Sequence, residues 1–148
     1  MKHAILSACA TIVTAISFPA GAHGSQHHTN AGALKPPERV TPLFKRELPN
    51  VPGKTLIAAE VLFPPGAASP AHTHPKSAFI YAQVLSGEIV SAVGDEKPRL
   101  YRAGEGWYEA PGAHHKVARN ASKERPAKLL AIFVTDSGEQ QLVFPDAK

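Results

Sequence analysis

Short runs of alternating apolar and polar residues fill the chain from residue 40 onward and predict β-strands. In segment 54–63, Glu60 lies on one face, and the other face carries Thr55, Ile57, Ala59, Val61 and Phe63. Further runs, rich in β-branched and aromatic residues, occupy 78–85, 88–93, 99–102, 106–110, 115–119, 127–135 and 141–144. Turn-forming residues separate these runs, and no segment beyond residue 22 keeps helical spacing over three turns. The pattern predicts an all-β sandwich or small barrel.

One run departs from this alternation. The residues LLAIFV, within segment 127–135, are apolar on both faces. Such a strand is either central in the fold and covered on both sides, or covered by a neighbouring subunit. The second alternative predicts a homodimer.

The first 22 residues have the form of a secretory signal peptide. A basic start precedes an uncharged apolar run, and Ala20 and Ala22 frame the expected cleavage site. The apolar run is short for a membrane span, so no stable membrane anchor is expected. A buried first helix and lipidation at Cys9 are the alternatives. We expect a periplasmic or secreted protein, with a flexible segment at 23–39 and one barrel domain at 40–146.

Charge and cysteine content narrow the classes of partner. The formal net charge is +4, and the basic residues are spread along the chain without a block or a stripe interleaved with aromatic residues. This argues against nucleic acid as a partner and favours a small-molecule ligand. Cleavage after Ala22 would remove the only cysteine, so the mature chain would hold neither a disulfide nor a thiol ligand.

His72 and His74 are the first candidates for chemistry, because residues two apart on a strand share a face. Two adjacent imidazoles suit a divalent transition ion such as iron, manganese, zinc, nickel or copper. Such pairs also occur on surfaces without a metal, so a third ligand is needed to decide.

Two motifs around these histidines resemble those of the cupin superfamily. The first combines a glycine, an HxH pair and a closing glycine, and is matched by Gly66, His72, His74 and Gly87. The second combines a glycine, a PxG turn, a histidine and an asparagine, and is matched by Gly104, Gly112, His115 and Asn120. The resemblance covers roughly 40–144. It implies a cupin-type double-stranded β-helix, or jelly-roll barrel, with a metal held inside by His72, His74 and His115.

The chain departs from the cupin motifs at three points. Ala110 stands where the first proline of the second motif is expected, and one extra residue precedes Asn120. Ile80 stands at the position of the glutamate ligand of the first motif. The resemblance therefore implies a three-histidine site, or a site whose fourth ligand is Glu109 or, as a second candidate, Gln83. The alternative for Glu109 is a surface carboxylate at the end of a strand.

Three functions are consistent with these residues. Three neutral imidazoles leave an ion with its full charge and open positions, which suits water activation or polarisation of a substrate oxygen. An enzyme with such Lewis-acid chemistry, or with dioxygenase-like oxygen chemistry, needs a proton-transfer group near the ion, for which Glu109 and Tyr81 are the candidates. A non-catalytic module that binds a ligand or stores a metal is the second function. A structural dimeric barrel with a vestigial site is the third.

Other residues near the motifs have alternative roles. Four aromatic residues could line a pocket around the ion or pack in the core: Phe79, Tyr81, Trp107 and Tyr108. In a regular strand Arg119 would share the face of His115 and could contact an anionic substrate, or it could form a salt bridge at the barrel end. His114 should point away from His115, to the rim or an interface. A mobile tail that binds metal weakly is expected to contain His23, His27 and His28.

Overall fold

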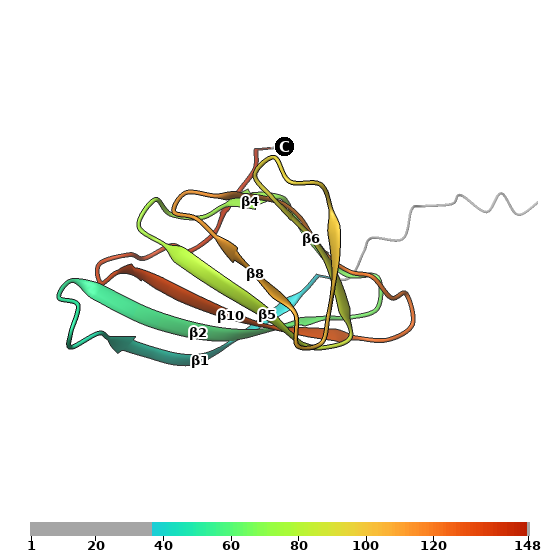
Figure 1. Ribbon diagram of the computed structural model, residues 1–148, viewed down its shortest axis with the longest axis horizontal. Helices are drawn as coiled ribbons and strands as arrows, with labels where there is room; N and C mark the ends of the chain where they lie inside the picture. The colour runs from blue at the N-terminus through green and yellow to red at the C-terminus, as the bar shows by residue number, and fades with distance from the viewer. Residues whose placement is uncertain (1–36, 148) are drawn as a thin grey trace, which may run out of the picture. The chain divides into compact units, whose positions relative to one another are not determined.

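Eleven β-strands and no helix occur in residues 37–147, the part of the chain that the computed structural model describes (Figure 1). The strands are β1 (Arg39–Glu47), β2 (Lys54–Phe63), β3 (Ala68–Ser69), β4 (His72–Thr73), β5 (Phe79–Ser86), β6 (Glu88–Val93), β7 (Arg99–Arg102), β8 (Gly106–Glu109), β9 (His114–Asn120), β10 (Ala127–Asp136) and β11 (Phe144–Pro145). Over the same residues, no helix is long and apolar enough to cross a membrane. The predicted signal peptide and the N-terminal histidine cluster lie outside the described residues.

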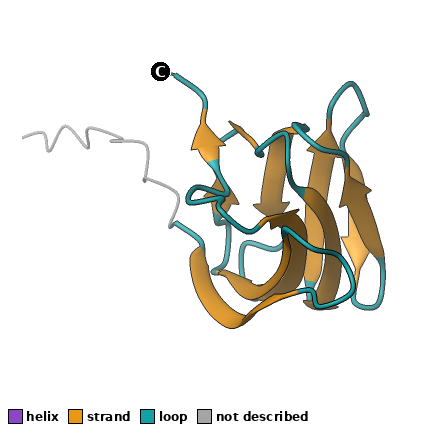
Figure 2. Cartoon of the chain, turned by 90° about the vertical axis from the view of Figure 1, so that its left-hand side faces the viewer, coloured by secondary structure: helices purple, strands orange, loops and turns teal. Residues whose placement is uncertain are grey.

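The strands form two antiparallel sheets (Figure 2). Sheet A has the order β1-β2-β10-β5-β8, and sheet B has the order β11-β4-β9-β6-β7, with β3 paired to β9. Strands that are distant in the sequence are neighbours, since β10 lies between β2 and β5 while β9 lies between β4 and β6. This crossing of the chain between two sheets is the arrangement of a jelly roll, and the predicted all-β barrel is confirmed.

The predicted strands agree with the observed ones except at the two ends of the domain. From β2 to β10, every strand listed from the alternation pattern begins and ends within one residue of its expected position. The predicted strand at 141–144 is wrong, because the last strand is confined to Phe144–Pro145. The pattern also did not single out β1, all nine residues of which are exposed. An edge strand without a buried face has no burial to impose an alternation on its sequence.

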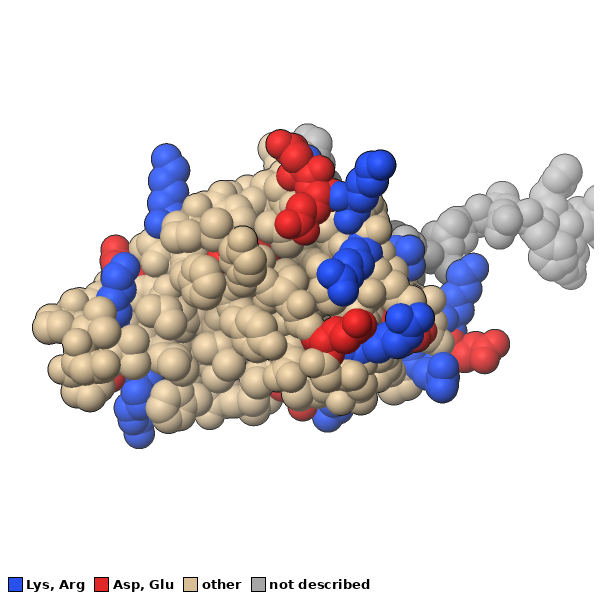
Figure 3. Space-filling model, in the orientation of Figure 1, with Lys and Arg blue, Asp and Glu red and all other residues tan. Residues whose placement is uncertain are grey.

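The outer face of sheet A is apolar. One cross-strand row on this face, here called the outer row, consists of Phe44, Ala58, Ile132, Tyr81 and Tyr108. Phe79 stacks on Tyr108 with their ring centroids 5.9 Å apart. Charged side chains of both signs gather mostly on the right-hand side of the view in Figure 3, and fewer lie at the left-hand end. Segment 127–135 is thus the central strand of sheet A, and its outward side chains, including Ile132, are only half-buried.

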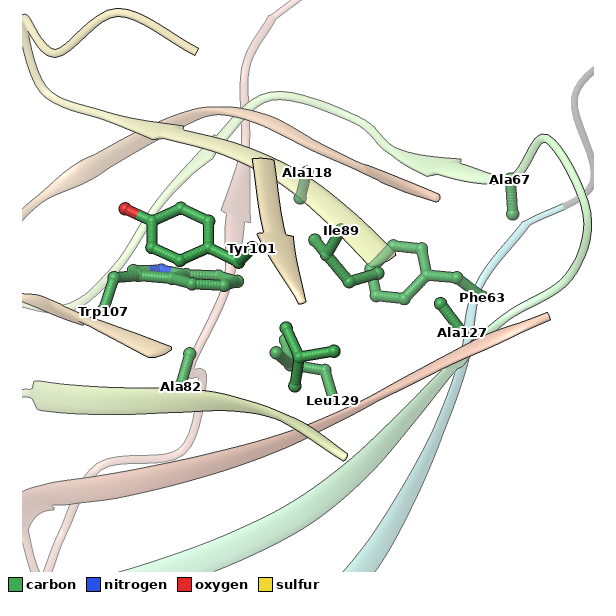
Figure 4. Close-up of a cluster of buried hydrophobic side chains, with 10 residues drawn as sticks. Phe63, Ala67, Ala82, Ile89, Tyr101, Trp107, Ala118, Ala127 and Leu129 are labelled. Atoms are coloured by element: carbon green, nitrogen blue, oxygen red, sulfur yellow. The ribbon is translucent and has the colours of Figure 1, made fainter. Parts of the chain in front are cut away.

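The inward faces of the two sheets pack into a core around Tyr101 and Trp107 (Figure 4), whose rings lie 4.7 Å apart. The face of β2 that carries Thr55, Ile57, Ala59, Val61 and Phe63 points inward, with Phe63 and Thr55 almost fully buried. A second, smaller core cluster consists of Ala78, Ile80, Ala131 and Phe133. Both clusters leave space between the sheets for the site described next.

Asn120, the last residue of β9, ties the end of the barrel together. Its Nδ2 donates to the carbonyl oxygens of Phe63, Pro64 and Arg125, at 3.2, 3.1 and 2.7 Å, and its Oδ1 accepts from the N–H of Ser122 at 2.9 Å. A buried amide that is satisfied on both ends stabilises the fold without costing an unpaired polar group. The asparagine of the second motif therefore has a structural role here.

Candidate metal centre

Three histidines from two strands of sheet B converge inside the barrel. His72 in β4 pairs directly with His115 in β9, so the backbone register of the sheet brings their side chains together. His74 follows β4, and its ring lies edge-on to that of His72 with the centroids 4.8 Å apart. All three rings are buried, and one ligand nitrogen from each lies within 4.8 Å of the others.

The extra residue between His115 and Asn120 is accommodated by a β-bulge. Val93 of β6 pairs with His115 and Ala92 pairs with Val117, which leaves Lys116 unpaired. The bulge shifts the alternation by one residue, so His115 and Asn120 both face inward although they are five residues apart. The expectation that Arg119 shares the face of His115 is wrong for the same reason, because Arg119 is exposed on the other side of β9.

Glu109, at the end of β8, completes the cluster. Its side chain is 2 % exposed, so the alternative of a surface carboxylate is wrong. Oε1 lies 3.2 Å from Nδ1 of His115 and accepts a hydrogen bond from Nε1 of Trp107 at 3.1 Å. Oε2 lies 3.3 Å from Nε2 of His74. Glu109 pairs across the sheet with Ile80, the residue that stands in place of the motif glutamate, so both side chains project into the same region from adjacent strands.

Each ring nitrogen that faces away from the cluster has its own hydrogen-bond partner. Nδ1 of His72 lies 2.8 Å from the carbonyl oxygen of Pro70, and Nδ1 of His74 lies 2.7 Å from that of Leu142. A carbonyl only accepts, so Nδ1 of both rings carries a proton, and in the neutral form of each ring this leaves Nε2 with a free lone pair. Nε2 of His115 lies 2.9 Å from Oγ of Ser91. Such outer partners fix the tautomer and the orientation of metal-binding histidines.

The atoms that face one another are suited to a cation. Oε2 of Glu109 is buried and has no hydrogen-bond partner of good geometry, although the lone pair on Nε2 of His74 is only 3.3 Å away. Two acceptors at this distance repel each other unless a positive charge lies near both. Ligand atoms that share a zinc-sized ion at about 2.1 Å lie roughly 3.0–3.4 Å apart, as the nitrogen–oxygen pairs do here. The three histidines could therefore hold a divalent transition ion, and the carboxylate of Glu109 lies beside two of them.

Comparison with known proteins agrees with this geometry. Residues 59–133, half of the chain, match the Cupin domain family. The chain belongs to the cupin family. A search of curated protein sequences found no match to this cupin.

Three solved structures illustrate the relationship. The protein TT1209 from Thermus thermophilus is 26% identical, with 66% of this chain and 83% of that chain covered and a TM-score of 0.55. An oxalate oxidase in complex with the substrate analogue glycolate is 26% identical, with 72% and 54% covered and a TM-score of 0.55. The DMSP lyase DddQ from Ruegeria pomeroyi DSS-3 is 26% identical, with 63% and 45% covered and a TM-score of 0.52. This cupin spans about half the length of the two named enzymes.

Burial keeps the ligand groups of this cupin in the form that binds metal. Burial lowers the pKa of His115 to about 4, despite the opposing charge of Glu109, and burial also lowers the pKa of His72. Burial raises the pKa of Glu109, but the contact with His74, the neighbouring His115 and the Trp107 N–H outweigh it, so that this pKa lies below its ordinary value. At neutral pH the site thus offers neutral imidazoles and an ionised carboxylate.

Two other residues predicted for the site lie on the wrong face of β5. Tyr81 and Gln83 alternate with the buried Ile80 and Ala82, so their side chains point to the outer face of sheet A. Tyr81 is 41 % exposed and does not line the cavity, which removes it as a proton-transfer group near the ion. Gln83 reaches toward the carbonyl oxygen of Gly104, at 3.5 Å, and is not placed to act as a ligand.

The other predicted residues are divided between the core and the surface. Trp107 is buried beside His115, with the ring centroids 6.0 Å apart, and it orients Glu109. Phe79 and Tyr108 are exposed on the outer face, so neither of their expected roles, pocket lining or core packing, is found. His114 points outward, as expected, and its Nε2 lies 2.9 Å from Oδ2 of Asp146.

Sequence reasoning missed the outer partners of the histidines. Ser91 is 2 % exposed and lies on the inward face of β6 together with Ile89. A lone hydroxyl on the apolar face of an alternating segment was a usable signal for this position. The carbonyl groups of Pro70 and Leu142 carry no such signal, because every residue has a carbonyl.

Acid should destabilise the metal-free protein through His115. The unfolded ring has a pKa near 6.5 and the folded ring about 4, so the unfolded state binds more protons between these values. The free energy of unfolding should therefore fall as the pH drops from 6.5 to 4, by about 3 kcal/mol from this group, and Glu109 should add to the loss at lower pH. Urea titrations of chelator-treated protein would measure the slope. His115→Asn should reduce the dependence of the unfolding free energy on pH between 6.5 and 4. An equally steep dependence in that variant would contradict the assignment of the acid destabilisation to His115.

Proposed function

We propose that this cupin is a metal-dependent enzyme that acts on a small molecule, with a divalent transition ion held by His72, His74, His115 and Glu109. The observation that carries the proposal is the buried carboxylate of Glu109, which faces the free nitrogens of two histidines and has one oxygen without a hydrogen-bond partner. Nitrogen and oxygen ligands in this ratio suit iron, manganese, zinc, nickel or copper. A bound ion would supply Lewis acidity or oxygen activation.

The surroundings of the cluster favour catalysis over metal storage. The four residues line a cavity of about 360 Å³ whose other walls are mainly aliphatic and aromatic side chains. Such a cavity excludes water and can orient a small molecule against the ligands. Storage needs no adjoining cavity, and a vestigial site would not keep a buried carboxylate at a cost in desolvation. The solved oxalate oxidase and DMSP lyase, which resemble this chain, are named as enzymes.

Removal of single ligands tests the metal site. His72→Ala and His115→Ala should abolish stoichiometric metal, because each removes one of three imidazoles, and Glu109→Gln should weaken binding at least about tenfold. Elemental analysis after dialysis, with chelator competition for affinity, would measure both effects. His114→Ala is the matched control and should keep one ion per chain. Retention of one ion by His72→Ala would move the site elsewhere. Full metal affinity in Glu109→Gln with loss of turnover would make Glu109 a base, not a ligand.

We also propose that the chain is exported to the periplasm or secreted. The support is the pattern of residues 1–22 and the lack of any cysteine after Cys9. Expression of the full chain in a host with a secretory pathway should give a mature protein that begins at His23, which intact-mass measurement would show. A retained Met1 in the bulk of the folded protein would contradict export.

A second copy of the chain is the partner that we propose for the outer face of sheet A. The outer row crosses all five strands without a charged residue. Near it, Lys128 and Glu60 neutralise each other at 3.0 Å, and the guanidinium of Arg46 lies 5.9 Å from the ring of Phe44 on the exposed edge strand β1. Two such faces can pair about a two-fold axis if Arg46 stays at the rim of the contact. The exposed stack of Phe79 on Tyr108 would lie in the contact.

Light scattering at micromolar concentration should therefore report a dimer. Tyr108→Lys, which places a charge on the most exposed aromatic residue of the outer row, should shift the protein to monomer. Val51→Lys changes an exposed apolar residue in the turn between β1 and β2 and should leave the dimer intact. A wild-type protein that is monomeric at these concentrations would overturn the pairing.

A further inference from the structure

The cavity beside the histidines exists because one row of sheet A is built from alanines. Ala59, Ala131 and Ala82 pair across β2, β10 and β5 and face inward; we call them the alanine row. The two neighbouring inward rows carry large side chains, which include Phe133 and Leu129. All three alanines line the cavity and are nearly buried. Figure 4 shows Ala82 and, from the facing sheet, Ala118 projecting into the interior.

The metal ligands lie beside the alanine row in the same cavity. The row continues from Ala82 to Trp107, whereas Glu109 lies in the adjacent inward row with Ile80 and Phe133. The ring of His74 lies over that adjacent row, 5.8 Å from the ring of Phe133. The cavity thus has polar ligands on one side and an apolar wall over the alanine row, which extends from β5 across β10 to β2.

Charge limits the ligand further. The residues that line the cavity include the carboxylates of Glu109 and Glu38 and contain neither lysine nor arginine. Among the ligand groups themselves, a divalent ion with the carboxylate of Glu109 and neutral histidines has a net charge of +1, and Glu38, which is half-buried in the cavity wall, adds a negative charge that disfavours a second anionic group. One negative charge on a ligand would neutralise the ion and its ligand groups, whereas a second negative charge would be buried without a partner.

We propose that this cavity takes a small molecule with a single monoanionic head at the metal and an apolar body over the alanine row. The inference rests on the proposed metal site and names the substrate class for it. Oxalate, named for one of the similar enzymes, is a dianion without an apolar body and falls outside this class. The alanines act as specificity-determining residues, because their size sets the volume available to the body of the ligand.

Calorimetry on the zinc-loaded protein with three carboxylates tests the ligand class. Hexanoate and acetate share a head, but hexanoate has four more methylenes, each worth up to about fourfold in affinity when buried. Adipate has a similar body with a second charge at its far end. We expect hexanoate to bind at least tenfold more tightly than either acetate or adipate. Equal affinities for hexanoate, acetate and adipate on a protein that holds one zinc would overturn the proposed ligand class and leave the proposed metal site standing. Absence of zinc binding would overturn the proposed function and this inference together.

Filling the space over the alanine row tests the role of these residues. Ala59→Phe should reduce hexanoate affinity at least tenfold, to that of acetate, with the zinc content and the acetate affinity unchanged. Val51→Phe adds an aromatic ring in the turn between β1 and β2, away from the cavity and the outer row, and should leave hexanoate binding intact. Ala59→Val is a milder change that the fold tolerates more readily, and it should also reduce the affinity for hexanoate. Unchanged hexanoate affinity in both folded Ala59 variants would overturn the assignment.

Discussion

The carboxylate of Glu109 is buried beside three histidines in a cavity whose other walls are mainly apolar. The surrounding structure compensates for that burial. An ionised group away from water is strongly unfavourable unless hydrogen bonds and opposite charge stabilise it. The indole N–H of Trp107 satisfies one oxygen, and the two histidine nitrogens lie beside both oxygens. The unpartnered oxygen leaves the cluster incomplete by itself, and the proposed cation would complete it. The strand register, the tautomers of the histidines and the position of Trp107 all serve this one requirement.

In the proposed metal site, the carboxylate would come from the strand next to the one that carries the motif glutamate. Ile80 on β5 and Glu109 on β8 are cross-strand partners, so their side chains reach nearly the same place from adjacent backbones. A carboxylate can thus be lost from one strand and supplied by its neighbour without a change in the fold. The bulge at Lys116 has a similar effect on β9, because it absorbs one inserted residue and keeps His115 and Asn120 inside.

The two faces of sheet A have different functions that follow from the same alternation. On the inner face, small residues in the alanine row leave a cavity next to the ligands. On the outer face, aromatic and β-branched residues form an exposed apolar surface. Central β10 contributes to both, with Ala131 inward and Ile132 outward. Its sequence is apolar throughout because neither face of this strand is left fully to water.

The alternation and the turn residues by themselves determined the strands and the all-β class, because the period of two and the turns are local properties of the chain; the jelly-roll barrel and the meeting of three histidines were implied only by the resemblance to the cupin motifs. The alternation also showed which residues share a face; Trp107 and Tyr108, as neighbours in one strand, could not both point inward. Only the tertiary structure decided which face was the inner one, and it placed Tyr81 and Gln83 outside and Glu109 inside. It alone decided that β8 lies next to β5, and that a bulge turns Arg119 away from His115. The pairing of distant strands and a one-residue shift of register depend on the packing of the whole barrel, which the alternation within a single segment does not encode.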